Sequence, residues 1–340
     1  MRDGGRDPGA GVIREEHLIT VGRVFDDEPE AVLAVTVTAP EAARLADPPL
    51  VYFCVPGGGL DRGYYDLRAG ATTRYSFAEQ IAARGGITIA IDPLGIGGST
   101  RPARGFELTP ERHARALAAL HAAAGARLRS GRLLAGLAPL PEFVCIGVGH
   151  SLGGLMTVFQ QAEVRSFDGL VLLGFGTGGL PSALDDEMRT CAGDPAGARA
   201  HVVRLAQRWY AEPYPPLGVD GRGREIYGGR ADPDAIAAMR ACRAPLLATT
   251  AVFSIIPGSS APEAARVDVP LLLVAGDSDL CGPARELAAD FPRSPAISVL
   301  ELADTGHSHF AFPSVDELFP RIAAWAGSLG AARAPRQAHA

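Results

Sequence analysis

A serine stands between glycines at the end of an apolar segment, in a setting suited to nucleophilic chemistry. Gly149-His150-Ser151-Leu152-Gly153-Gly154 follows the apolar run FVCIGV and precedes the helical pattern LMTVFQQAEV. This is the G-x-S-x-G elbow in its required context of strand, sharp turn and helix. The glycines are needed because side chains at 149 and 153 would collide with neighbouring backbone, while the strained turn projects Oγ outward. Ser151 is therefore predicted to be a nucleophile; the alternative is a serine that only caps a helix.

Short apolar runs recur along the chain and must form the frame that holds this serine. They occupy residues 50–55, 87–92, 143–148, 169–174, 269–276 and 296–303. Runs that are apolar on both faces and alternate with helical patterns are typical of a parallel sheet covered on both sides. Two strand-like stretches between residues 12 and 38 indicate an antiparallel start. A helix is predicted to open at Thr109-Pro110.

The interval from residue 181 to 265 interrupts this alternation. It contains helical patterns and Pro/Gly stretches such as EPYPPLG, but no comparable strand run. Long insertions are often functional lids, so we predict a helical lid over the carboxyl edge of the sheet, with ordinary connecting helices as the alternative. The predicted organisation is a disordered tail over 1–11, a first core part over 12–180, the lid over 181–265, a second core part over 266–328 and a tail over 329–340.

These motifs in their setting resemble the α/β-hydrolase superfamily, in the lidded branch that includes esterases, lactonases, thioesterases and C–C bond hydrolases. Residues 92–99, DPLGIGGS, are similar to the family's D-x-x-G-x-G-x-S turn, which is structural. The resemblance covers residues of about 48 to 180 and 266 to 325 and covers the lid poorly. It implies the α/β-hydrolase fold, a mostly parallel, doubly wound sheet with a helical lid insertion.

The same resemblance implies a carboxylate that orients the catalytic base. In this fold the chain order is serine, acid, histidine, and the acid should follow the strand VPLLLVAG. Gly276-Asp277-Ser278-Asp279 stands there. The family pattern G-x-x-D selects Asp279 as the catalytic acid, with Asp277 as the alternative.

The histidine should follow the last strand, AISVLELA. Thr305-Gly306-His307-Ser308-His309 lies there, and the family's common G-H pairing selects His307 as the base. His309 is close enough to compete. His150 stands beside the nucleophile, and in similar proteins that position is not the base.

An acyl-transfer serine also needs an oxyanion hole made of two backbone N–H groups. The resemblance implies that one donor is the residue after the nucleophile, here Leu152, and that the other comes from the loop after the third strand. That loop is Pro56-Gly57-Gly58-Gly59-Leu60, with proline where the family usually has histidine. Gly58 is the predicted second donor and Gly59 the alternative.

Composition and charge exclude several other functions. Every basic residue is an arginine, so no lysine Schiff base and no P-loop lysine can exist. The net charge of −6 is spread along the chain, which argues against a nucleic-acid partner because phosphate binding needs a basic face. No apolar run approaches the roughly 20 residues that span a bilayer, and the N-terminus shows no secretory signal.

The five cysteines are scattered and form no C-x-x-C pair. They are Cys54, Cys145, Cys191, Cys242 and Cys281. This usage is typical of buried or idle thiols in a reducing cytoplasm, and no spacing supports a zinc site. We therefore predict a cytoplasmic protein without a metal site or cofactor.

Together these features predict a serine hydrolase that cleaves a carboxylic ester through an acyl-enzyme. Thioester, lactone or C–C bond hydrolysis, and acyl transfer or cyclisation, are alternatives on the same triad. A non-catalytic ligand-binding protein of the same fold is a further alternative. The partner expected is a small molecule, an apolar acyl ester; the oligomeric state is not predicted. The lid aromatics Trp209, Tyr210, Tyr214 and Tyr227 either contact such a ligand or form the lid's own packing.

Overall fold

The computed structural model describes residues 11–216 and 230–333. Residues 1–10 of the predicted disordered tail over 1–11, and residues 334–340 of the predicted tail over 329–340, lie outside the described residues. The strands are β1 (Val12–Arg23), β2 (Glu30–Pro40), β3 (Leu50–Val55), β4 (Ile87–Ile91), β5 (Val144–His150), β6 (Gly169–Leu173), β7 (Leu271–Gly276) and β8 (Ile297–Leu302). The helices are α1 (Phe77–Ala82), α2 (Pro110–Arg129), α3 (Leu152–Val164), α4 (Asp186–Arg189), α5 (Pro195–Trp209), α7 (Pro233–Ala241), α8 (Ala248–Ile255), α9 (Ala261–Ala264), α10 (Ala284–Leu287) and α11 (Val315–Arg333).

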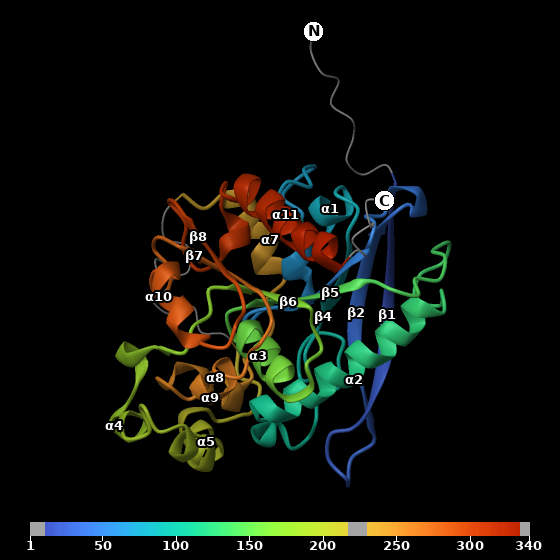
Figure 1. Ribbon diagram of the computed structural model, residues 1–340. Helices are drawn as coiled ribbons and strands as arrows, with labels where there is room; N and C mark the ends of the chain where they lie inside the picture. Colours follow the sequence, from blue (N-terminus) through green and yellow to red (C-terminus); the bar gives the residue numbers. More distant parts are fainter. Residues whose placement is uncertain (1–10, 217–229, 334–340) are drawn as a thin grey trace.

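The strands form one eight-stranded sheet in the order β1-β2-β4-β3-β5-β6-β7-β8 (Figure 1). β1, β2 and β4 pair antiparallel, and every pair from β4 through β3 to β8 is parallel. β3 to β7 are fully buried, as expected for parallel strands with helices on both faces. The predicted fold class, a mostly parallel, doubly wound sheet of the α/β-hydrolase type with an antiparallel start, is confirmed.

Helices cover both faces of this sheet. α2 and α3 pack on one face, while α1 and α11 pack on the other (Figure 1). α11 continues to Arg333, beyond residue 329 where the tail was expected to begin. The helix continues because Leu329 packs on the core face formed with β3 and β6. No helix of the described residues is long and apolar enough to cross a bilayer.

The helices between residues 181 and 265 divide between the two faces. Val202 of α5 and Phe253 of α8 pack into the core with α2 and α3, whereas Ala235 and Met239 of α7 pack into the core with α1 and α11. The described helices of the predicted lid therefore belong to both layers around the sheet. Residues 217–229 of it lie outside the described residues.

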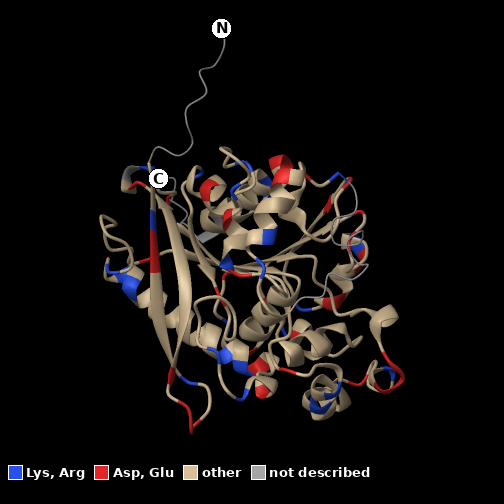
Figure 2. Cartoon of the chain, turned by 180° about the vertical axis from the view of Figure 1, so that it is seen from behind, with Lys and Arg blue, Asp and Glu red and all other residues tan. Residues whose placement is uncertain are grey.

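Acidic and basic side chains are interspersed over the strands, helices and loops in Figure 2. Many of them pair, as Arg74 does with Asp316 and Arg62 with the buried Asp92. Asp92 also accepts hydrogen bonds from the backbone N–H groups of Arg62 and Gly98. These contacts give the D-x-x-G-x-G-x-S segment a structural role, because they tie the turn after β4 to the loop after β3.

His113 of α2 is buried. It is 1% exposed, and within the described part of the chain neither ring nitrogen has a hydrogen bond. Burial lowers its pKa from 6.5 to about 3. Between those two values the unfolded chain holds a proton that the folded protein lacks, so the free energy of unfolding falls as the pH is lowered through this window.

We expect His113→Leu to make the protein less sensitive to acid. The wild-type protein should lose about 1.4 kcal/mol from this histidine for each pH unit below about 6.5, and the variant should not. Urea unfolding at pH 7, 6 and 5 measures the difference. His201→Leu, at an exposed position of α5, is the matched control and should leave the pH dependence unchanged. Parallel pH curves for wild type and His113→Leu would contradict the prediction.

Candidate active site

Ser151 occupies a strained turn between β5 and α3. Its φ of 51° and ψ of −117° lie in a region that residues with a side chain rarely adopt. A Cβ at Gly149 would stand 2.5 Å from the Cα of Gly154, and one at Gly153 would stand 2.1 Å from the carbonyl oxygen of Val55. The tight backbone packing predicted around the elbow is thus present, and it leaves Oγ at the carboxyl edge of the sheet.

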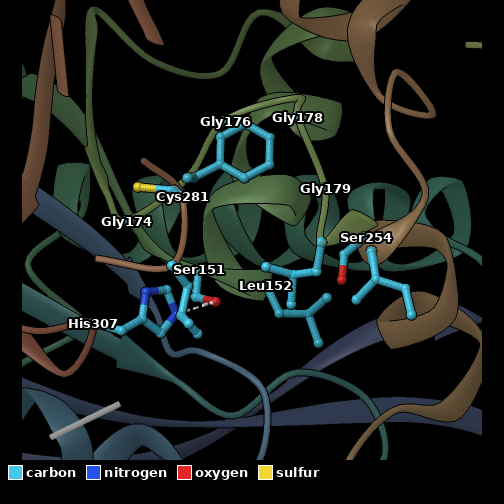
Figure 3. A pocket seen from close by; sticks show the side chains of 13 residues that line it. Ser151, Leu152, Gly174, Gly176, Gly178, Gly179, Ser254, Cys281 and His307 are labelled. Atoms are coloured by element: carbon cyan, nitrogen blue, oxygen red, sulfur yellow. Dashed lines mark hydrogen bonds between the residues drawn. The ribbon is translucent and has the colours of Figure 1, made fainter. Parts of the chain in front are cut away.

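His307 lies between Ser151 and Asp279. Its Nε2 is 2.8 Å from Ser151 Oγ, a contact drawn in Figure 3, and its Nδ1 is 2.6 Å from Asp279 Oδ1. A carboxylate only accepts hydrogen bonds, so Nδ1 carries the proton and the lone pair of Nε2 faces the serine hydroxyl. The arrangement can remove the serine proton when a carbonyl carbon is attacked.

Asp279 is buried yet ionised. Burial alone would raise its pKa, but the charges of His307 and His309 and the hydrogen bond of His307 outweigh it and hold the pKa of this carboxyl well below its usual range. The backbone N–H of Gly276 donates to Oδ2 at 3.2 Å and that of Cys281 to Oδ1 at 3.3 Å. An ionised carboxylate at this place can stabilise a histidine cation during a reaction.

Asp277, the alternative acid, faces elsewhere. Its carboxylate accepts hydrogen bonds from the backbone N–H groups of Asp304, at 2.8 Å, and Thr305, at 3.1 Å. It therefore joins the loop after β7 to the loop after β8, which carries His307. The structure does not bring Asp277 to His307.

His309, the alternative base, faces the opposite oxygen of Asp279. Its Nε2 is 2.7 Å from Oδ2, and its side chain is fully buried. Of these two histidines, it is His307 that contacts the serine hydroxyl.

His150 supports the loop that carries His307. Its Nε2 lies 2.9 Å from the carbonyl oxygen of His307, and because a carbonyl only accepts, Nε2 carries the proton. Burial is the main reason that the pKa of His150 lies well below 6.5, and the nearby charges of His307 and His309 lower it further. The neutral ring stacks on Tyr64 with 4.7 Å between ring centres. The sequence analysis excluded His150 as the base, but nothing in the sequence predicts this contact between residues 157 positions apart.

The loop after β3 lies beside the start of α3. A Cβ at Gly58 would be 3.4 Å from Leu152 Cδ2, so the two predicted oxyanion donors are neighbours. Within the described part of the chain, the N–H groups of Gly58 and Leu152 have no acceptor, and neither does that of Gly59. These N–H groups are available to bind an oxygen that becomes negative.

The segment after α7 pairs with this loop. Ala244 N–H donates to the carbonyl oxygen of Gly59 at 2.9 Å, and Asp61 N–H donates to that of Cys242 at 2.9 Å. Leu60 and Arg243 form an antiparallel bridge between the same segments. Sequence gave no signal for this pairing, because its residues are far apart in the chain and follow no strand pattern.

A cavity of about 80 Å³ opens beside Ser151 (Figure 3). Its lining comes from the nucleophile turn, the glycine-rich segment after β6, the end of α8 and the loop after β7. The lining residues are Ser151, Leu152, Gly174, Phe175, Gly176, Gly178, Gly179, Leu180, Ser254, Ile255, Leu280, Cys281 and His307. The signal in the sequence that could have located it is the run GFGTGG directly after a buried strand.

The aromatic residues Trp209, Tyr210 and Tyr214 do not line this cavity. Trp209 Nε1 donates to Asp185, and Tyr214 OH donates to the carbonyl oxygen of Pro102. Trp209 and Tyr210 contact each other edge to face. For these three residues the packing alternative holds; Tyr227 lies outside the described residues.

Burial and the neighbouring Asp279 raise the pKa of the Cys281 thiol, which keeps this cavity-lining cysteine protonated.

Comparisons with known proteins agree with the observed fold. A model of the alpha/beta hydrolase family matches residues 52–319, whereas no curated protein matches the sequence. Among solved structures, a thermophilic esterase from Thermogutta terrifontis is 17% identical with a TM-score of 0.57, over 92% of this chain and 99% of the esterase. A proline iminopeptidase from Mycobacterium smegmatis is 18% identical with a TM-score of 0.58, over 94% and 99%.

A bromoperoxidase from Bacillus anthracis is 13% identical with a TM-score of 0.53, over 92% of this chain and 99% of that chain. These likenesses show a shared fold that carries different reactions. The family model spans the nucleophile turn, Asp279 and His307. The chain belongs to the alpha/beta hydrolase family.

Proposed function

We propose that this protein is a serine hydrolase that cleaves a carboxylic ester by a Ser-His-Asp triad. The observation that carries the proposal is the continuous series of contacts from Ser151 Oγ through both ring nitrogens of His307 to Asp279. Its membership of a hydrolase family supports the same reaction class. A ligand-binding protein would have no need of a serine held in a strained turn and aligned with a histidine.

The reaction begins when Ser151 Oγ attacks the ester carbonyl while His307 Nε2 takes its proton. The carbonyl oxygen becomes negative and is bound by the N–H groups of Leu152 and Gly58. Asp279 stabilises the imidazolium, which then gives its proton to the leaving alcohol. Water, deprotonated by the same His307, attacks the acyl-enzyme and releases the acid with free Ser151.

Labelling by a fluorophosphonate, followed by peptide mass spectrometry, tests the nucleophile. We expect one adduct, on Ser151. A parallel panel of p-nitrophenyl esters, a thioester and a lactone tests the bond, and we expect the esters to react fastest. Faster thioester or lactone hydrolysis would change the substrate class while leaving the triad in place. No labelling and no hydrolysis of any compound would defeat the proposal.

Asp279→Asn should lower kcat by about 10⁴-fold, the loss found when the equivalent carboxylate of a serine protease becomes an amide. The reason is that an amide NH₂ facing Nδ1 favours the wrong tautomer of His307. Asp277→Asn is the matched control two residues away; its partners are backbone N–H groups, so it should keep kcat within about threefold of the wild-type value. Steady-state kinetics on p-nitrophenyl butyrate measures both. The reverse order of effects would move the acid role to Asp277.

A further inference from the structure

The cavity beside Ser151 is small. Its volume is about 80 Å³, below the roughly 300–1,000 Å³ of typical ligand pockets. The reacting carboxylic ester group takes part of this space, which leaves little room for a chain attached to it.

The wall of the cavity is fixed by hydrogen bonds rather than by loose side chains. Leu180 N–H donates to the carbonyl oxygen of Ile255 at 2.8 Å, and Gly258 N–H donates to that of Thr177 at 2.8 Å. Thr177 is held from outside by Asp290, through both its N–H and its hydroxyl. The segment after β6 is thus tied to the end of α8, so a movement that widens the cavity must break hydrogen bonds between them.

The opposite side of the nucleophile is filled. A Cβ at Gly58 would meet Leu246 at 3.2 Å, and the space between the Gly57–Gly59 loop, Met156 and Leu247 is about 10 Å³. A group bound next to Ser151 must therefore enter the cavity on the β6 side.

The cavity also selects for charge and orientation. Among the described residues that line it, only the His307 side chain can carry a charge at neutral pH, since the Cys281 thiol is kept protonated. His307 and Ser254 lie on opposite sides of Ser151 (Figure 3). The leaving oxygen must stay beside His307 to receive its proton, which directs the acyl group toward Leu180 and Ile255.

We propose that the substrates are esters of short, uncharged carboxylic acids, with an acyl chain of about two to four carbons. This inference rests on the proposed function. Longer chains are excluded by the fixed wall at Leu180 and Ile255, and charged acyl groups by the absence of a charged partner there. The inference narrows the apolar acyl ester expected from sequence to its short members.

Hydrolysis of p-nitrophenyl acetate, butyrate and octanoate tests chain length. We expect kcat/KM for butyrate to exceed that for octanoate by at least about tenfold, because each excess methylene meets a filled wall. Succinate monoester and butyrate methyl ester form a second pair, in which only the uncharged ester should react. Equal or faster octanoate hydrolysis would overturn the inference. If no ester reacts and fluorophosphonate does not label Ser151, the proposed function fails, and this inference with it.

Leu180→Ala tests the wall directly. It should raise octanoate hydrolysis and reduce the butyrate-to-octanoate ratio by about tenfold. Leu18→Ala, at a leucine that is 61% exposed on β1, is the matched control and should leave the ratio unchanged. A ratio that stays at the wild-type value in folded Leu180→Ala would contradict the assignment of the acyl group to this side.

A second inference comes from a different observation: both oxygens of Asp279 face histidines. His307 Nδ1 lies 2.6 Å from Oδ1 and His309 Nε2 lies 2.7 Å from Oδ2. Asp279 and His309 have fully buried side chains. The His309 contact is short but not well aligned as a hydrogen bond, so it acts mainly through the close approach of an N–H dipole or cation to the carboxylate.

The His309 ring is held firmly in this place. It meets the ring of His150 edge to face at 5.7 Å, and a Cβ at Gly174 would stand 3.1 Å from its Cε1. The next residue, Phe310, stacks on Tyr64 at 4.7 Å between ring centres. The ring therefore cannot swing away from Asp279 without moving this cluster.

We infer that His309 is a positioning residue that fixes the rotation of the Asp279 carboxylate. With Oδ2 held by His309, Oδ1 remains directed at His307 Nδ1. The other donor to Oδ2, the N–H of Gly276, is farther away at 3.2 Å. Without His309 the carboxylate can rotate, and His307 loses its orientation toward Ser151.

His309→Gln and His309→Leu separate a polar role from mere packing. The glutamine keeps an N–H near the position of Nε2, and the leucine keeps bulk without a donor. We expect kcat of the leucine variant to fall about 10–100-fold below the wild-type value, while its KM stays within about threefold of the wild-type value. The glutamine variant should recover at least half of this loss in kcat on a logarithmic scale. If the leucine variant does not fold, His309→Asn replaces it, because its N–H is too short to reach Oδ2. Full kcat in folded His309→Leu, or equal losses in both variants, would overturn the inference.

Discussion

Ser151→Ala is expected to lose ester hydrolysis by about 10⁶-fold and to lose fluorophosphonate labelling completely. Removal of the nucleophile in a serine protease costs this much, because the histidine and aspartate then have no hydroxyl to activate. The variant should still fold, since the alanine keeps the Cβ already present in the turn. Turnover of p-nitrophenyl butyrate, labelling and circular dichroism measure the three properties.

The control for this experiment is Ser130→Ala. Ser130 is exposed after the end of α2 and bonds only to carbonyl oxygens of its own helix and to Arg132, so activity and labelling should stay at wild-type values. Near-wild-type turnover in folded Ser151→Ala would falsify the assignment of Ser151.

Ser151→Gly is expected to make the folded protein more stable while it removes the activity. Glycine adopts a φ of 51° without the strain that serine bears there, so the free energy of unfolding should rise by about 1 kcal/mol while hydrolysis is lost. Urea unfolding of the glycine and alanine variants, compared with the wild type, measures the gain. A glycine variant less stable than the alanine variant would show that the turn is not strained.

The fold could be predicted because its central strands, β3 to β7, are fully buried. Runs such as 50–55 and 269–276 are apolar on both faces, and that pattern has one common solution, a parallel sheet under two layers of helices. The nucleophile turn could be predicted for a steric reason, since Gly149 and Gly153 admit no Cβ. Such constraints act between residues close in sequence or on whole strands, so the sequence displays them.

Contacts between distant loops leave no such pattern. Nothing in residues 305–309 shows that His307 faces one oxygen of Asp279 and His309 the other; alternate positions after a strand end differ only in how the loop turns. The division of α7 from α5 and α8 between the two faces also depends on tertiary packing. The pairing of Ala244 with Gly59 could not be predicted for the same reason.

His307→Ala is expected to lose kcat by about 10⁴- to 10⁶-fold, comparable with loss of the nucleophile. His307 Nε2 is the nitrogen that lies within hydrogen-bond distance of Ser151 Oγ. Without it the hydroxyl keeps its proton at neutral pH, and the leaving alcohol has no general acid. His309→Ala should keep measurable turnover, because His309 contacts Asp279 and not the serine.

Added imidazole separates these two histidines further. The His307 side chain is 11% exposed and borders the cavity, so its removal opens a space that free imidazole can enter from the solvent and occupy as a base. We therefore expect 10–100 mM imidazole to raise the rate of His307→Ala by at least about tenfold above the rate in buffer of the same pH. The His309 side chain is fully buried, and imidazole should leave the rate of His309→Ala unchanged. An active His307→Ala beside an inactive His309→Ala would transfer the base role to His309, and imidazole rescue confined to His309→Ala would do the same.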